Sequence, residues 1–221
     1  MTGPAPGRSG GEPPFDGGPH WVWWLSIHAL DLLVRLLGPV RVQGSQHLPP
    51  RGGALLAANH VSSLDPVVLL VVAHRCGRKV RFLGVQEVHD HPLAGPFIRA
   101  GRHIPVRQGA PSRAPLQAAE RALRAGELVL VYPEGTVPEQ GVDVAAKGGV
   151  GLIALRAGVP VVPVRSRGLE RGRTRTWRPW RRLPASVTLG APLDLPEVGH
   201  LRGGARYAAI GDAVLAAIRA L

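Results

Sequence analysis

Short apolar runs alternate with amphipathic stretches along most of the chain after Gly38, and this alternation limits the possible folds most strongly. The predicted strands are 40–42, 54–58, 80–85, 103–106, 128–132, 159–164 and 186–189. The predicted helices are 66–75, 111–125, 147–157 and 205–220. Strands that alternate with helices are typical of an α/β sheet with a substantial parallel part. The sequence therefore predicts a single α/β domain with a mixed, largely parallel central sheet flanked by helices.

Two of the runs, 128–132 and 159–164, are apolar without the alternation expected of a half-exposed strand. Such runs are typical of strands that are buried on both faces. The length of 221 residues suits one domain with its own core. The single cysteine, Cys76, excludes an intrachain disulfide framework and a zinc site built from cysteines.

The chain divides into three parts by composition. Residues 1–19 are dominated by Gly and Pro, which predicts a disordered tail, and they lack the pattern of a secretory signal. Residues 20–38 are predicted to form an amphipathic helix, because helical spacing places the charged and polar side chains on one narrow face. Residues 39–221 are predicted to form the folded domain.

The 20–38 helix carries Asp31 and Arg35 and has several tryptophans at one end. Each of the two charges would cost roughly 2.5–3.5 kcal/mol at the centre of a membrane-spanning helix, which argues against a span. We therefore predict that the helix lies in a membrane interface. The alternative is a helix docked on the protein's own core, and both can hold on opposite faces.

The formal net charge is +12, which favours polyanionic partners such as nucleic acid, an anionic membrane surface or phosphorylated substrates. Residues 165–184 interleave eight arginines with Trp177 and Trp180. This composition suits single-stranded nucleic acid or an anionic lipid leaflet. No recognised nucleic-acid motif accompanies it, so we expect an anionic membrane surface as the partner, with a plain solvated loop as the alternative, and we disfavour nucleic acid.

The predicted strand 54–58 leads directly into Asn59 and His60, and Asp65 follows at the predicted N-cap of the next helix. Ligands of open α/β sheets bind outside the carboxyl ends of the strands. A carboxylate that holds one ring nitrogen of a histidine prepares the other nitrogen as a general base. The alternative is a loop histidine beside a helix cap. A covalent triad is disfavoured, because the nearby serines share one turn with His60 and no nucleophile elbow is present.

Two further stretches carry polar groups beside predicted strands. Residues 133–136 combine a flexible glycine with a hydroxyl and a carboxylate, which suits a hydroxylated ligand, or they form only a strand-ending turn. Arg99, Arg102 and Arg107 surround the predicted strand 103–106. Arginine is the side chain best suited to bidentate phosphate binding, although surface arginines are commonly only solvated.

Two other kinds of site are weaker candidates. Residues 149–154 fit a G-x-G-x-x-A dinucleotide fingerprint, but no strand is predicted immediately before them, so close helix packing is the favoured interpretation. His89 and His91 could face a metal, but no third ligand is apparent and a polar loop is favoured. We therefore predict no metal site.

The motifs NHVSSLD, IPVR, YPEGT and VPVVPV, in this order, resemble those of the glycerolipid acyltransferase family, in particular the 1-acylglycerol-3-phosphate acyltransferases. The resemblance covers residues 40–192 and makes 39–221 an acyltransferase domain. The chain departs from the family at Val137, where an arginine is common. The residues that carry the resemblance are Asn59, His60, Ser62, Asp65, Arg107, Glu134, Gly135, Thr136 and Lys147.

The resemblance implies acyl transfer from an acyl thioester, either acyl-CoA or acyl carrier protein, to the free hydroxyl of a lysophospholipid. The expected acceptor is 1-acylglycerol-3-phosphate, which gives phosphatidic acid. His60 would be the general base and Asp65 would orient it. No metal or prosthetic group is implied.

The resemblance assigns the other matched positions to substrate binding. Arg107 would bind the acceptor phosphate, with Arg99 as a competing assignment. The residues placed in the substrate site are Asn59, Ser62, Glu134, Gly135, Thr136 and Lys147. The expected location is peripheral, on the cytoplasmic face of the cell membrane. Two alternatives stay open: a different lipid or glycoconjugate acceptor, and a non-catalytic basic protein that binds membranes or RNA.

Overall fold

The computed structural model describes residues 19–107, 113–135, 146, 148–170 and 184–221. The strands are β1 (Val40–Gln43), β2 (Ala54–Ala58), β3 (Val80–Val85), β4 (Ile104–Val106), β5 (Leu128–Val131), β6 (Val161–Arg167) and β7 (Ala185–Leu189). The helices are α1 (His20–Leu37), α2 (Asp65–Arg75), α3 (Gln86–Asp90), α4 (Gly95–Ala100), α5 (Ala114–Arg124), α6 (Gly148–Ala157) and α7 (Gly204–Ala220), with a 3-10 turn at Ser45–His47.

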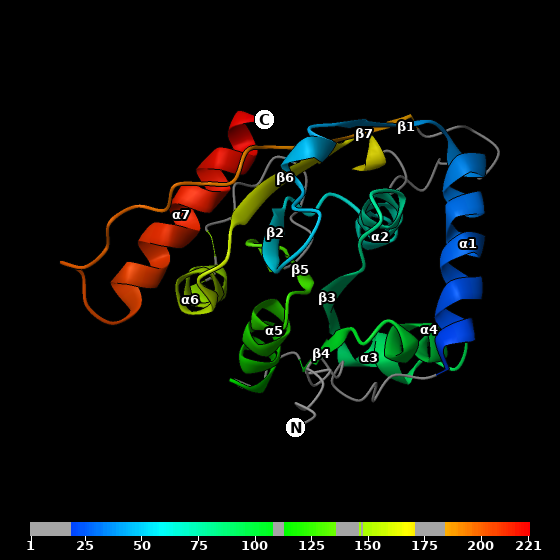
Figure 1. Ribbon diagram of the computed structural model, residues 1–221, viewed down its shortest axis with the longest axis horizontal. Coiled ribbons are helices and arrows are strands. Elements are labelled where there is room, and N and C mark those ends of the chain that lie inside the picture. Colours follow the sequence, from blue (N-terminus) through cyan, green and yellow to red (C-terminus); the bar gives the residue numbers. More distant parts are fainter. Residues whose placement is uncertain (1–18, 108–112, 136–145, 147, 171–183) are drawn as a thin grey trace, which may run out of the picture.

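The strands form one seven-stranded sheet in the order β1-β7-β6-β2-β5-β3-β4 (Figure 1). Of the neighbouring pairs in this order, β6 with β7 is antiparallel and the others are parallel. The predicted mixed, largely parallel α/β sheet is therefore confirmed. The strands β2 and β5 lie in its middle and are buried along their whole length, and for β5 the unbroken apolar run of 128–132 predicts this.

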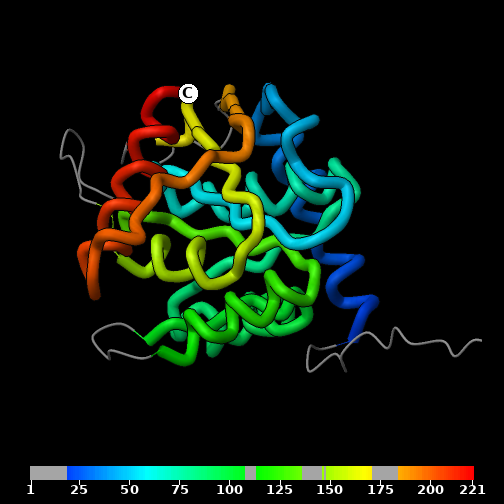
Figure 2. Tube along the Cα trace, turned by 60° about the vertical axis from the view of Figure 1, so that its left-hand side comes forward, coloured from blue at the N-terminus to red at the C-terminus, as the bar shows by residue number. Residues whose placement is uncertain are grey.

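The sheet separates two hydrophobic clusters. Leu56 of β2 and Leu130 of β5 point into the cluster covered by α1, α2 and α4. Leu55 and Val129 point to the opposite side, where α5, α6 and α7 pack. Figure 2 shows α6 and α7 side by side on that second face. Because successive strand residues alternate between the faces, each central strand contributes to both clusters.

Most element boundaries lie within a few residues of the predicted ones, with two notable exceptions. β6 begins at Val161 and continues to Arg167, past the predicted end at 164, because the backbone of Ser166 pairs with β7. Two short helices, α3 and α4, fill the segment between β3 and β4.

The predicted N-terminal helix is present as α1, and one of its faces is docked. Trp23, Ile27 and Val34 are buried, and the Trp23 ring stacks on Phe97 with centroids 5.2 Å apart. Asp31 accepts hydrogen bonds from Arg35 and from Arg75 of α2, each at 2.7 Å. On this face the core-docking alternative is therefore confirmed.

The opposite face of α1 is exposed. Its large exposed side chains are Trp21, Trp24, Leu25, Leu32, Leu33 and Leu36. Within the described ranges, no helix is both long and apolar enough to cross a membrane. The predicted tail falls outside the described residues, apart from Pro19.

Candidate active site

His60 and Asp65 meet in the loop that joins β2 to α2, at the carboxyl end of the central strand. The His60 ring nitrogen Nδ1 lies 3.0 Å from Asp65 Oδ2. The Asp65 side chain is fully buried, whereas that of His60 keeps 16% of its exposure. Because a carboxylate accepts a hydrogen bond, it favours the tautomer with the proton on Nδ1 and leaves Nε2 free to act as a base.

The same carboxylate oxygen also organises the loop. Asp65 Oδ2 accepts the backbone N–H groups of Val61 at 2.6 Å and Ser62 at 2.9 Å. The prediction that Asp65 caps α2 is wrong, because Asp65 is the first residue of the helix and its side chain caps none of the helix N–H groups. The carboxylate instead turns back to the preceding loop, which has its own unpaired N–H groups to satisfy.

The loop after β5 supports His60 from the other side. The Tyr132 ring stacks on the His60 ring with centroids 4.0 Å apart, and burial raises the pKa of the Tyr132 phenol well above its usual range. Glu134 Oε2 accepts the backbone N–H of His60 at 2.8 Å. Burial raises the pKa of the Glu134 carboxyl, and this hydrogen bond opposes the shift. Tyr132 was not among the predicted site residues. Its position directly before the Pro-Glu-Gly turn was the sequence feature that could have indicated it.

Asn59 and Ser62 hold the reactive loop in place. The Asn59 amide donates to the Ser166 carbonyl at 2.9 Å and accepts the Ser166 N–H at 2.7 Å, which ties the end of β2 to β6. The Ser62 hydroxyl is buried and accepts the N–H of Leu64 at 3.3 Å. At these two positions the side-chain polar atoms are engaged within the protein, and substrate contact there stays a prediction.

The remaining predicted residues fall into two groups. Arg107 and Gly135 line the groove beside His60. Arg99 does not, because its guanidinium donates to the carbonyl of His89 at 2.8 Å. Thr136 and Lys147 lie outside the described residues.

A groove of about 1130 Å³ opens at His60 and crosses the carboxyl ends of the strands. One part lies on the face covered by α1, α2 and α4, and its walls include Leu30, Leu70 and Ile98. The other part is walled by Leu116 of α5 and by the first half of α6. His60 and Tyr132 follow the two central strands and lie between these parts.

The weaker candidates have other roles in the structure. His89 is buried, and its Nε2 donates to the backbone carbonyl of His103 at 3.0 Å. Among the described residues, no cluster of three His, Cys, Asp or Glu side chains could hold a metal ion.

Gly151 packs against the backbone of Tyr207, as the helix-packing interpretation predicts. Arg165 donates to carbonyls at the end of α7, and residues 171–183 of the basic stretch lie outside the described ranges.

Comparison with known proteins gives consistent matches. The chain is 25% identical over 194 residues to a 1-acyl-sn-glycerol-3-phosphate acyltransferase of Bacillus subtilis, which covers 88% of this chain and 94% of that one. It is 34% identical over 143 residues to a lyso-ornithine lipid O-acyltransferase of Pseudomonas aeruginosa, with 64% of this chain and 51% of that protein covered.

The fold matches a solved structure as well. The crystal structure of a 1-acyl-sn-glycerophosphate acyltransferase from Thermotoga maritima superimposes with a TM-score of 0.66 at 23% identity, over 88% of this chain and 78% of that one. The profile of the family described as Acyltransferase matches residues 39–167, which include the His60–Asp65 loop and the end of β5. This protein is therefore an enzyme of the acyltransferase family.

Proposed function

We propose that this enzyme moves a fatty acyl group from an acyl thioester to the free hydroxyl of a lysophospholipid, with 1-acylglycerol-3-phosphate as the acceptor and phosphatidic acid as the product. The main support for this proposal is the His60–Asp65 pair at the edge of a large, mainly apolar groove. The name of the Bacillus subtilis relative supports the same acceptor.

The proposed reaction uses His60 as a general base in one step. His60 Nε2 takes the proton of the acceptor hydroxyl while the hydroxyl oxygen attacks the thioester carbon. The new C–O ester bond forms, the C–S bond breaks, and the leaving thiolate takes the proton back from His60. Asp65 stabilises the imidazolium that exists in between. General-base assistance of this kind contributes about 10²–10⁴ in rate. No metal or prosthetic group is needed.

The groove supplies binding groups for both ends of a lysophospholipid. Its aliphatic walls suit a fatty chain, and Arg107 offers a guanidinium for bidentate contact with a phosphate. The name of the Pseudomonas aeruginosa relative supports a second candidate acceptor, a lyso-ornithine lipid, which lacks this phosphate. Arg107→Gln separates the two acceptors, because it should weaken only the use of a phosphate-bearing one.

We further propose that the enzyme works on the cytoplasmic face of the cell membrane with α1 in the interface. The outer face of α1 exposes Trp21, Leu25 and Leu36, which suits the boundary between headgroups and acyl chains. Leu33 and Leu93 are exposed and also line the groove, so its opening adjoins this apolar surface. The net charge of +12 favours an anionic leaflet.

Thiol release from acyl-CoA in the presence of a panel of lysophospholipids tests the proposal. His60→Ala should lower turnover by about 10²-fold or more while the circular dichroism spectrum remains that of the folded protein. Ser63→Ala tests covalent catalysis at the exposed hydroxyl of the same loop and should keep most of the activity. Near-normal turnover of His60→Ala would rule out the mechanism.

A further inference from the structure

An acyl thioester bound at His60 must extend in two directions, because the acyl chain and the sulfur arm leave opposite sides of the reacting carbonyl. The groove offers two directions from His60. The part between α1, α2 and α4 has large aliphatic walls, including Leu30 and Leu70, and suits the acyl chain. The sulfur arm would then leave along the other part, between α5 and α6.

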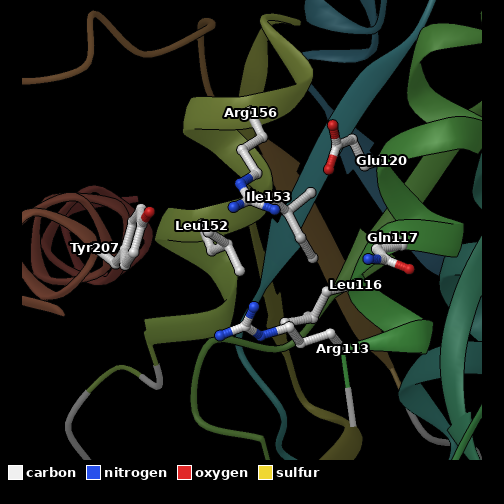
Figure 3. A pocket seen from close by; sticks show the side chains of 8 residues that line it. All are labelled: Arg113, Leu116, Gln117, Glu120, Leu152, Ile153, Arg156 and Tyr207. Carbon is white, nitrogen blue, oxygen red and sulfur yellow. The ribbon is translucent and has the colours of Figure 1, made fainter. Parts of the chain in front are cut away.

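A second, smaller cavity of about 150 Å³ lies beyond that part, between α5, α6 and α7. Leu116 and Ile153 line both the groove and this cavity, so the two spaces are adjacent. Figure 3 shows Arg113 and Arg156 reaching into the cavity from opposite ends, with Tyr207 on the α7 side. We call this cavity the Arg113–Arg156 pocket.

The charges of the pocket favour an anion. Both arginines are exposed, and within the described ranges neither guanidinium has a hydrogen bond or an ion pair. The carboxylate in the pocket, that of Glu120, is already paired with Arg124 at 2.9 Å. Two guanidinium groups that face one cavity are suited to a ligand with several phosphate oxygens, because each can bind in a bidentate manner.

The two helices α6 and α7 pack closely beside the pocket. A Cβ on Gly151 of α6 would lie 2.0 Å from the Tyr207 carbonyl oxygen, so α7 approaches α6 closely at this point. This contact holds the backbone of Tyr207 against α6, and the Tyr207 side chain lines the pocket together with the two arginines. An aromatic ring next to phosphate-binding groups offers a stacking surface for a nucleobase.

We propose that the Arg113–Arg156 pocket binds the phosphates of coenzyme A, so that the acyl donor of this enzyme is acyl-CoA. The proposal rests on the proposed function. The pantetheine arm would run past Leu116 and Ile153 to place the thioester at His60. Coenzyme A carries several phosphates beyond its pantetheine arm, whereas a carrier protein carries one, so two guanidinium groups beside the groove favour coenzyme A.

The test compares two donors that differ only in the nucleotide end. Arg113→Gln, Arg156→Gln and the double variant are assayed with acyl-CoA and with the matching acyl-pantetheine, which lacks the nucleotide. Arg121→Gln, an exposed arginine of α5 outside the pocket, is the control. The double variant should raise the KM for acyl-CoA about tenfold or more, since hydrogen bonds to charged groups are lost. Its kinetic constants with acyl-pantetheine and its KM for the acceptor should stay at the wild-type values.

Several results would overturn the proposal. The KM for acyl-CoA could stay unchanged in the double variant, or activity could fall equally with both donors. Either result would show that the pocket does not bind the nucleotide end of the donor. Activity with acyl carrier protein and none with acyl-CoA would do the same, while leaving acyl transfer at His60 intact.

A binding measurement keeps the two proposals separate. Free adenosine 3′,5′-bisphosphate, titrated calorimetrically, should bind wild type and Arg121→Gln and should bind the double variant at least tenfold more weakly. If no thioester supports turnover, the proposed function fails, and this titration still decides whether the pocket binds the nucleotide. No binding to wild type would overturn the proposal.

Discussion

At the scale of single residues, one oxygen organises the reactive loop. Oδ2 of Asp65 accepts hydrogen bonds from the His60 ring and from the next two backbone N–H groups. Glu134 then holds the backbone N–H of His60 itself. The imidazole is therefore fixed through its ring and through its main chain, which is the preorganisation that a general base needs.

A second histidine, His103, is buried for structural reasons. Its Nδ1 accepts the N–H of Phe82 at 3.2 Å, and its ring stacks on the Phe82 ring at 3.9 Å between centroids. Its other nitrogen, Nε2, is buried without a hydrogen bond among the described residues. Burial, together with the neighbouring His89 and Arg81, lowers the pKa of His103 to about 3, and burial is the largest of these causes.

This buried histidine predicts acid sensitivity. The unfolded chain binds a proton at His103 below about pH 6.5, whereas the folded chain does so only near pH 3. Stability is therefore lost as the pH falls through this window, by about 2 kcal/mol at pH 5. Urea unfolding at a series of pH values measures it. His103→Asn keeps an acceptor for the Phe82 N–H and should flatten this dependence, and equal pH slopes for both proteins would contradict the assignment.

The sequence was informative about the reactive pair and less so about the residues around it. The five-residue spacing of His60 and Asp65 correctly predicts their contact, because both lie in one short loop. The role of Asn59 could not be predicted, because its partner Ser166 is 107 residues away and becomes its neighbour only when β2 pairs with β6. A local pattern contains no information about such a partner.

At the scale of elements, a close contact between α6 and α7 depends on a glycine. A Cβ on Gly151 would lie 2.0 Å from the backbone oxygen of Tyr207, whereas a Cβ on Gly148 would lie 3.8 Å from the nearest heavy atom outside its own helix. Backbone cannot move aside as a side chain can. The helix-like pattern at 147–157 predicted α6 correctly. The sequence could not show that its glycines would pack against α7.

These two glycines form a matched pair of variants. Gly151→Ala should force the helices apart and lower the free energy of unfolding by about 1–3 kcal/mol. Gly148→Ala should change it by less than about 1 kcal/mol, because it meets only ordinary contacts and alanine favours helix. Thermal or urea unfolding checks both variants. Equal effects at the two positions would argue against tight packing at Gly151.

At the scale of the whole molecule, α1 has two different faces. The buried face, with Trp23 and Ile27, completes the core beside α4, and the outer face leaves Trp21, Leu25 and Leu36 exposed. The helical pattern of 20–38 predicted a helix with one narrow polar face, and it left core docking and membrane contact open for the apolar remainder. It could not show which side chains would dock, because that depends on where α2 and α4 lie.

The exposed face gives a prediction about membrane binding. A triple variant with Trp21, Leu25 and Leu36 replaced by serine should bind vesicles rich in phosphatidylglycerol at least about tenfold more weakly, because each large apolar side chain contributes roughly 1.5–3 kcal/mol when fully buried. Co-sedimentation measures this, and an unchanged unfolding midpoint controls for folding. Wild-type partitioning of the triple variant would exclude α1 as the lipid-binding element.

The groove shares its walls with the interior of the protein. Leu70, Phe82 and Ile153 line it, and each also belongs to one of the two hydrophobic clusters. If the groove selects fatty chains, a mutation that enlarges it removes packed methylene groups, each of which contributes about 0.8 kcal/mol to folding. Variants that accept bulkier lipids should therefore also unfold at a lower temperature, unless a second substitution elsewhere restores the lost stability.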